Sequence, residues 1–163
     1  MTDVVTIYTT AISAAAGISG AAISQYIGVI REGKQAKRDR AERHEAAKRD
    51  ACEKLLRAAI DLRTQVANNR SFRGDRSAMT DRLEKVREHA AAAQVHAASV
   101  ALLAPESVAE QADRLAGAAG ELADWTAVNT NLDQGALNAE PDFTVLNDRL
   151  AAFRTSAKGI AGD

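Results

Sequence analysis

Residues 79–104 read MTDRLEKVREHAAAAQVHAASVALLA, and this stretch decides the fold. Its apolar residues alternate spacings of four and three, which is the period of one face of an α-helix. Pro105 cannot continue that helix, but a proline is well suited to begin the next one. The stretch therefore predicts one long amphipathic helix whose apolar face comprises Met79, Leu83, Val86, Ala90, Ala93, Ala97, Val100 and Ala104.

Three further segments repeat this spacing on either side of it. The turn-rich residues 68–77 separate the first segment from the second, and the polar residues 129–140 precede Pro141, which is predicted to open the last helix. Four amphipathic helices with short connections predict an all-α fold, an antiparallel four-helix bundle or coiled-coil-like domain over residues 51–163. The other apolar faces are Leu55, Ala59, Leu62 and Val66; Val108, Ala112, Leu115, Ala119, Leu122 and Thr126, with Trp125 beside them; and Leu146, Leu150, Phe153 and Ala157.

The composition agrees with close-packed helices. Aromatic residues make up only 4% of the 163 residues, and alanine supplies most of the apolar share. Alanine is the best helix former, whereas strands need β-branched and aromatic side chains. A single cysteine, Cys52, cannot form an intramolecular disulfide. A thin alanine core also suggests that oligomerisation contributes to stability.

Residues 1–30 form a separate region with a different pattern. Between Asp3 and Arg31 lie 27 residues without charge, enough for a helix to cross a hydrocarbon core of roughly 30 Å. Tyr8 and Tyr26 lie near its two ends, where aromatic rings favour the membrane interface. No basic region precedes this stretch, so a removable signal peptide is not expected. We predict a transmembrane helix that continues into the first bundle helix; a helix buried between soluble subunits is the alternative.

Small residues recur along one side of that helix. In lipid, small side chains let two helix backbones approach closely, so such a face predicts self-association. The predicted self-association face, which Thr6 extends, comprises Thr10, Ser13, Gly17, Gly20, Ser24 and Gly28.

A charged segment, residues 31–50, follows and holds eight Lys or Arg against five acids. Opposite charges four residues apart predict a solvated helical linker. By the positive-inside rule, this excess places the N-terminus outside and the bundle in the cytoplasm, and it could contact anionic lipid head groups. Interleaved acids disfavour nucleic-acid binding. The predicted membrane-surface residues are Arg31, Lys34, Lys37, Arg38 and Arg40.

The sequence matches metal-binding and catalytic motifs only in part. Residues 129–140, NTNLDQGALNAE, resemble a calcium-binding loop, but Gly135 falls one position late for that motif. His44 begins a zinc-protease-like HExx string that ends in Lys48 instead of histidine. No phosphate loop, nucleophile set or paired catalytic carboxylate is visible. The sequence therefore predicts no enzyme, no cofactor and no metal site.

The histidines and the cysteine are expected to have structural roles. His89 and His96 lie seven residues apart on one helix face, and bundle-rim positions are expected for both. Cys52 has basic neighbours that could lower its pKa, but we expect it to pack in the first bundle helix.

Several segments together carry a resemblance: AKRDRAERHEAAKRDA at residues 36–51, LLRAAIDLR at 55–63, APESVAEQADRL at 104–115 and LAAFRTSAKG at 150–159. With the weakly apolar N-terminal helix, this plan resembles small uncharacterised actinobacterial or actinophage membrane-anchored helical proteins. The resemblance implies the architecture and no residue-level function.

Three functions are compatible with these patterns. The first is a non-enzymatic single-pass membrane protein that self-associates and acts as a scaffold or recruitment module at the inner membrane face, with an unknown protein partner. The second is a small oligomeric pore, or holin-like protein, in which the Ser and Thr residues line water. The third is a soluble helical assembly protein with the N-terminal helix buried between subunits.

Overall fold

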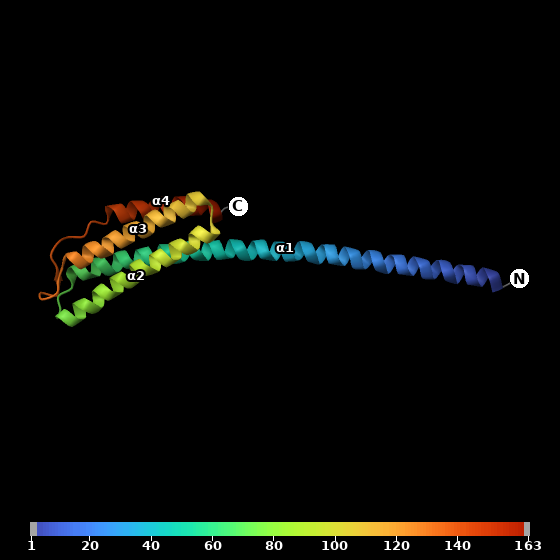
Figure 1. Cartoon of the computed structure of the whole chain (residues 1–163), viewed down its shortest axis with the longest axis horizontal. Coiled ribbons are helices and arrows are strands. Elements are labelled where there is room, and N and C mark those ends of the chain that lie inside the picture. Colours follow the sequence, from blue (N-terminus) through green and yellow to red (C-terminus); the bar gives the residue numbers. More distant parts are fainter. Residues whose placement is uncertain (1–2, 162–163) are drawn as a thin grey trace. The chain divides into compact units, whose positions relative to one another are not determined.

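The computed structural model describes the backbone of residues 3–161 and the side chains of residues 35–159. Its helices are α1 (Asp3–Ser71), α2 (Arg76–Leu103), α3 (Glu106–Val128) and α4 (Thr144–Ala161). Two short strands, β1 (Thr130–Asn131) and β2 (Ala136–Leu137), connect α3 to α4 (Figure 1). The prediction of a mostly helical, all-α fold is confirmed. The chain divides into two compact units, Met1–Arg43 and His44–Asp163.

The first unit is helical from Asp3 onward, and its side chains at positions 35–43 are all exposed. No helix in the described part of the chain is long and apolar enough to span a bilayer. The predicted membrane span and its small-residue face lie outside the residues whose side chains are described. Both therefore stay predictions.

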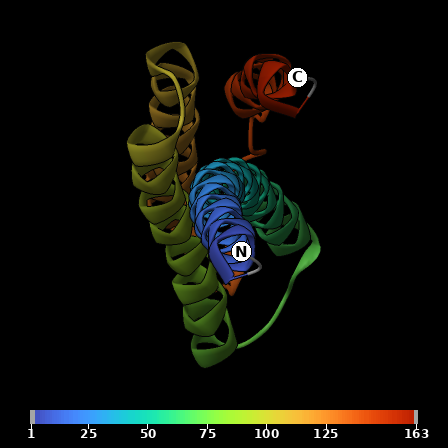
Figure 2. The same ribbon diagram turned by 90° about the vertical axis from the view of Figure 1, so that its right-hand side faces the viewer.

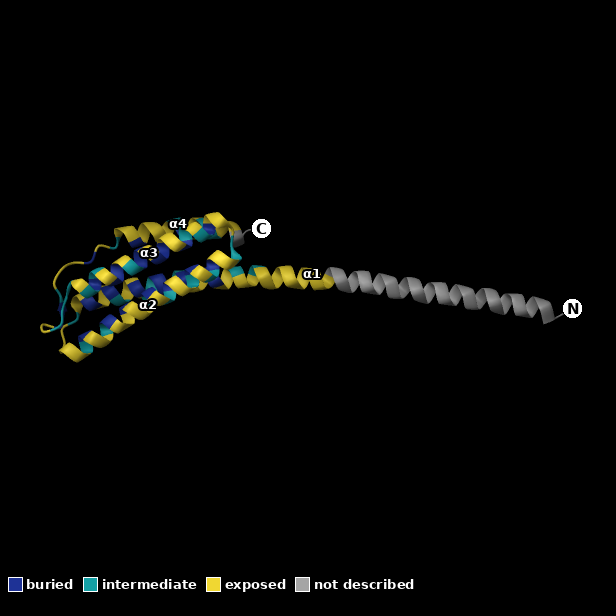
Figure 3. Cartoon of the chain, viewed as in Figure 1, coloured by how far each residue is buried: buried dark blue, intermediate teal, exposed yellow. Residues whose placement is uncertain are grey.

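The second unit is a helical bundle with one hydrophobic core. α3 packs against both α2 and α4, an arrangement that Figures 1 and 2 show from two directions. The predicted apolar faces point inward: of the α2 series, every residue from Met79 to Val100 is buried, and Ala104 is half-buried because it caps the helix end. Figure 3 shows buried residues recurring between exposed ones along each bundle helix. The core joins residues of all four helices, including Leu55, Leu62, Leu115, Leu150 and Phe153.

Alanine supplies much of this core. Twelve of the 26 buried hydrophobic residues are alanines, so the helices pack closely and few large side chains fill the space between them. Among the described residues, Phe153 is the largest fully buried side chain, with 0% of its surface exposed. The stability of the bundle therefore depends strongly on a few large residues.

Side-chain oxygens stabilise two helix starts. The Asp75 Oδ1 accepts a hydrogen bond of 2.8 Å from the Ala78 backbone N–H and caps α2. The Asp142 Oδ1 accepts from the Thr144 N–H at 2.8 Å. The prediction that Pro141 opens the last helix is therefore wrong by three residues, because α4 begins at Thr144 after this capping carboxylate. Pro105 directly precedes α3, as predicted.

A two-stranded hairpin replaces the predicted polar loop at residues 129–140. Thr130 pairs with Leu137 and Asn131 with Ala136. The Asn131 Oδ1 accepts hydrogen bonds from the backbone N–H groups of Asp133 (3.0 Å) and Gln134 (3.1 Å), which closes the turn. This loop is therefore organised by its own hydrogen bonds. Asn131 occupies the third of residues 129–140, a ligand position in calcium-binding loops, and its side-chain oxygen is engaged within the turn.

Gly135 joins the hairpin to the loop between α1 and α2. Its φ is +55°, in the left-handed region that glycine tolerates best. A Cβ at this position would lie 1.9 Å from the Gly74 carbonyl oxygen. Only a glycine allows the two backbones to approach so closely, and this contact holds the hairpin against the end of the bundle.

Candidate interaction surfaces

Four large hydrophobic side chains are exposed among residues 35–159. Their exposed fractions are 63% for Val95, 86% for Leu102, 82% for Val128 and 52% for Val145. Single exposed apolar residues are common, but groups of them mark interaction sites. Val95 and Leu102 belong to α2, and Val128 and Val145 belong to α3 and α4, so the four residues define two faces.

The first face is the α2 ridge, which we define as Ala91, Val95, Ala98 and Leu102. All four residues are exposed, and their spacings of four, three and four place them on one side of the helix. The opposite side of the same segment, which includes Ala93 and Ala97, is buried in the core. No Asp, Glu, Lys or Arg occurs between Glu88 and Glu106. The ridge is therefore a continuous uncharged strip on a helix surface.

The second face is the Trp125 groove, a hollow of about 180 Å³ between α3 and the start of α4. The half-buried Trp125 indole lies among apolar residues of both helices, and Val128 follows it by one helical turn. Two carboxylates, Glu121 and Asp142, also line the groove. The complete lining is Ala118, Glu121, Leu122, Trp125, Asp142, Val145 and Leu146.

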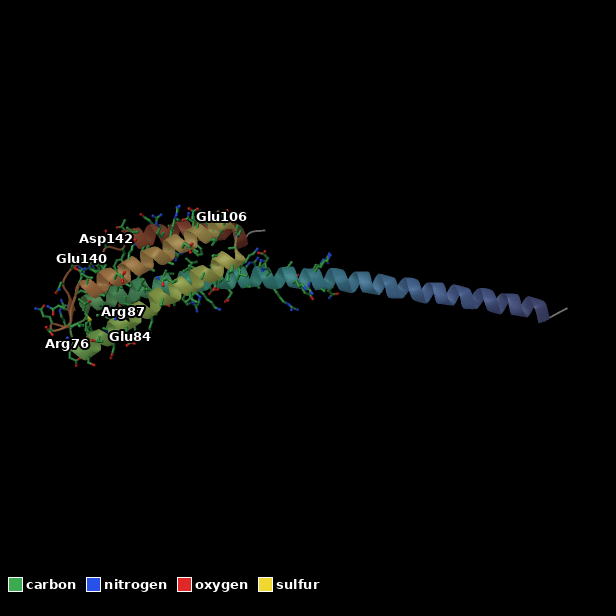
Figure 4. All side chains as sticks on the ribbon, viewed as in Figure 1. Arg76, Glu84, Arg87, Glu106, Glu140 and Asp142 are labelled. Atoms are coloured by element: carbon green, nitrogen blue, oxygen red, sulfur yellow. The ribbon has the colours of Figure 1, made fainter. Side chains whose placement is uncertain are left out.

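Acidic side chains lie around the groove. Asp124, the neighbour of Trp125 on α3, is a further exposed carboxylate, whereas Arg114 lies eleven residues before Trp125. Hydrogen bonds from Thr144 hold the pKa of Asp142 below its usual range, so this carboxylate remains ionised at neutral pH. Figure 4 labels Asp142, which lies two residues before the start of α4. The groove therefore combines an apolar floor with an acidic rim.

A second hollow lies beside the α2 ridge. It has a volume of about 600 Å³ and is formed by the first half of α2 and by Leu132 of the hairpin turn. Its charged residues, Glu84, Arg87 and Glu88, are all exposed. Ala91 belongs to both this hollow and the ridge. The uncharged surface of α2 therefore continues into a charged surface at the hairpin end.

Polar contacts at the hairpin end are structural. The buried Asn69 accepts a hydrogen bond of 3.1 Å from Arg82, whose guanidinium also lies 3.9 Å from the centroid of the Phe72 ring. Arg70 pairs with Glu140 at 2.7 Å, and both side chains are largely exposed. Exposed ion pairs contribute little to stability. Asn69 and Arg82 thus form the interior part of a network that links α1 to α2.

Ion pairs also connect α2 to the hairpin. Arg76 lies 3.5 Å from Asp133, and both side chains are largely exposed. Figure 4 shows Arg76 and Glu140 toward the hairpin end of the bundle and Glu106 toward the other end. The two carboxylates of residues 129–140, Asp133 and Glu140, therefore pair with different arginines.

The sequence-predicted site residues fall into two groups. Lys37, Arg38 and Arg40 are described and exposed, which leaves them accessible to an anionic surface. The other predicted residues lie outside the described side chains: Thr10, Ser13, Gly17, Gly20, Ser24, Gly28, Arg31 and Lys34.

Other titratable candidates have local structural roles. Cys52 is buried, and burial raises the pKa of its thiol, so the basic neighbours do not activate it. The prediction that it packs in the first bundle helix is confirmed. Glu45 pairs with Lys48 at 2.6 Å, and this hydrogen bond lowers the pKa of Glu45. His89 and His96 are half-buried on α2. The described residues contain no group of three metal-ligating side chains.

Comparisons of the chain with protein-family models, with curated proteins and with solved structures gave no match.

Sequence reasoning did not find the Trp125 groove or the α2 ridge. The groove brings Trp125 together with residues about twenty positions later in the chain. A local spacing pattern cannot predict a contact between such distant residues. The ridge had a signal, a second 4-3-4 series on α2 that starts at Ala91. That signal was hidden because alanine occupies both sides of the helix in this segment.

Proposed function

We propose that this chain is a non-enzymatic scaffold that self-associates and recruits a protein partner at the inner face of a membrane. The observation that carries the proposal is the sorting of the exposed large apolar side chains onto two separate faces of the bundle. A protein with two docking faces can hold two partners at once. The predicted self-association of the N-terminal helix would add a third point of assembly and membrane attachment.

The Trp125 groove is the recruitment face in this proposal. Its occupant is a cationic helical segment of another protein that places an apolar side chain beside Trp125. The acidic rim, Glu121 and Asp142, complements the positive charge of such a segment. Electrostatic complementarity of this kind speeds association and suppresses wrong partners. Val145 lines the groove, and the exposed Val128 extends the apolar contact beyond it.

Membrane attachment is tested by fractionation of cells that express the full chain, followed by alkaline carbonate extraction. The proposal expects the protein to remain in the membrane pellet. Release into the soluble fraction would remove the membrane part of the proposal and leave the soluble assembly protein. A Gly20→Leu variant, which fills the predicted small-residue face, is expected to lose self-association in sedimentation while it stays in the pellet.

Recruitment is tested by a photo-crosslinking amino acid placed at Val145 in the source cells. The matched control is the same amino acid at Arg154, an exposed position nine residues later on the opposite side of α4. The expected result is a crosslinked protein at Val145 that is absent at Arg154 and is lost when Val128→Glu is added. Identical crosslinking at both positions would show that the groove does not recruit a partner.

A further inference from the structure

We infer that the α2 ridge pairs with the α2 ridge of a second copy of this chain, in antiparallel orientation about a two-fold axis. This inference deepens the proposed function, because it names one of the contacts through which the scaffold would assemble. The argument depends on the spacing, the sizes and the charges of the residues along the exposed side of α2.

The spacing of the ridge is the same in both directions. The intervals from Ala91 to Leu102 are four, three and four, so the series is symmetric about a point between His96 and Ala97. A two-fold interface requires a surface that is complementary to its own rotated copy. In the antiparallel pairing, Val95 faces Ala98 of the partner subunit, and Ala91 faces Leu102 of the partner subunit.

The sizes of the side chains favour this orientation. Each antiparallel contact places a large side chain against an alanine, which keeps the two helices at an even separation along the ridge. A parallel pairing would instead place Leu102 against Leu102 and Ala91 against Ala91, so the helices would be too far apart at one end. Interiors are densely packed and tolerate such gaps poorly. Even packing therefore selects the antiparallel arrangement.

The charges at the two ends of the ridge also favour the antiparallel arrangement. A parallel pairing would set Glu84 and Glu88 beside the same acids of the partner, where like charges repel. The antiparallel pairing carries Arg87 past the C-terminal end of the partner's α2. That end has no basic residue in its last turn, and the free carbonyls of a helix end attract cations. Glu88 lies beside Arg87, so the charge contribution is small and the apolar contacts dominate.

One helix face of this length buries less area than a typical stable interface. The ridge therefore pairs effectively only where the local concentration of the chain is high. Attachment of several copies to one assembly supplies such a concentration without any new contact. The ridge then orders copies that the N-terminal helices have brought together.

Cysteine crosslinking of the full chain tests the orientation, in a Cys52→Ser background. Chains with Val95→Cys and chains with Ala98→Cys, carrying different tags, are mixed and oxidised. The expected result is a mixed disulfide that forms about tenfold faster than the disulfide between two Leu102→Cys chains, because only aligned Cα atoms within about 7 Å can be bridged. The matched control is Val128→Cys with itself, because Val128 is an exposed valine on another face.

A swap of side-chain sizes supplies a second measurement. Leu102→Ala is expected to slow the mixed 95–98 crosslink about tenfold, and the double variant Ala91→Leu with Leu102→Ala is expected to restore it, because the large residue again faces an alanine. All these positions are exposed, and alanine and leucine both favour helices. Faster Leu102–Leu102 crosslinking, or no rescue by the swap, would overturn the inference. Chains that sediment as oligomers without the mixed disulfide would reject the ridge contact and leave the proposed function standing.

Discussion

Replacement of Gly135 by alanine tests how the hairpin is held against the bundle. A left-handed conformation costs an alanine about 1–2 kcal/mol, and Gly135 has a φ of +55°. The new Cβ would lie 1.9 Å from the Gly74 carbonyl oxygen, so the hairpin must move, at the cost of about 1–3 kcal/mol seen for overpacked sites. Alanine also lowers the conformational entropy of the unfolded chain, which offsets about 0.4–1 kcal/mol of this loss of stability. We expect Gly135→Ala to lower the free energy of unfolding by roughly 1–4.6 kcal/mol.

The same substitution at Gly117 is the matched control. Gly117 is an exposed residue inside α3, and no atom lies within 4 Å of the position of an added Cβ. Gly117→Ala should therefore stabilise the protein by about 0.5–1 kcal/mol. Urea unfolding of the full chain, followed by fluorescence of its only tryptophan, Trp125, measures both changes. Equal midpoints for wild type and Gly135→Ala would refute the close contact between the hairpin and the α1–α2 loop.

Four further outcomes follow from single residues. Phe153→Ala should lower the free energy of unfolding by about 3–5 kcal/mol in urea titrations, because Phe153 is fully buried in an alanine-rich core; a loss below about 1 kcal/mol would contradict this. Asp75→Ala should cost about 1 kcal/mol through loss of the α2 cap, whereas Asp75→Asn should cost much less; equal losses would exclude capping. The folded-state pKa of Asp142 is lowered. Its contribution to stability is therefore present above the unfolded-state pKa and is lost as the pH falls through the folded-state pKa. An NMR titration in which the Asp142 carboxyl group has its ordinary pKa would contradict this. The Cys52 thiol, whose pKa is raised by burial, should react with a thiol reagent far more slowly in native protein than in urea, and equal rates would show that it is accessible.

The helices could be predicted because their signal is local. Large apolar residues such as Leu55, Leu62 and Leu115 recur at helical spacing, and each is fully buried in the structure. A helix that must bury one face reveals that face in its period. The connections between helices were predictable in place, because prolines and turn residues interrupt the period.

The hairpin could not be predicted in the same way. Its strands have two residues each, too short for an alternating pattern. Its position depends on Gly135 lying against Gly74, a contact between segments far apart in the sequence. The start of α4 was misplaced for a related reason. A proline is a common first helical residue, but the Asp142 carboxylate caps the Thr144 N–H and sets the boundary later.

The α2 ridge shows why composition alone could not separate the core from the surface. From Ala90 to Ala101, alanine lies on every side of the helix: Ala90, Ala93 and Ala97 are buried, Ala92 is half-buried, and Ala91, Ala98 and Ala101 are exposed. The first half of α2 resolves the ambiguity, because the large buried residues Met79, Leu83 and Val86 set the phase of the inward face. A regular helix carries that phase to its C-terminal end. Val95 and Leu102 then lie on the outward side, where the bundle's own core cannot cover them.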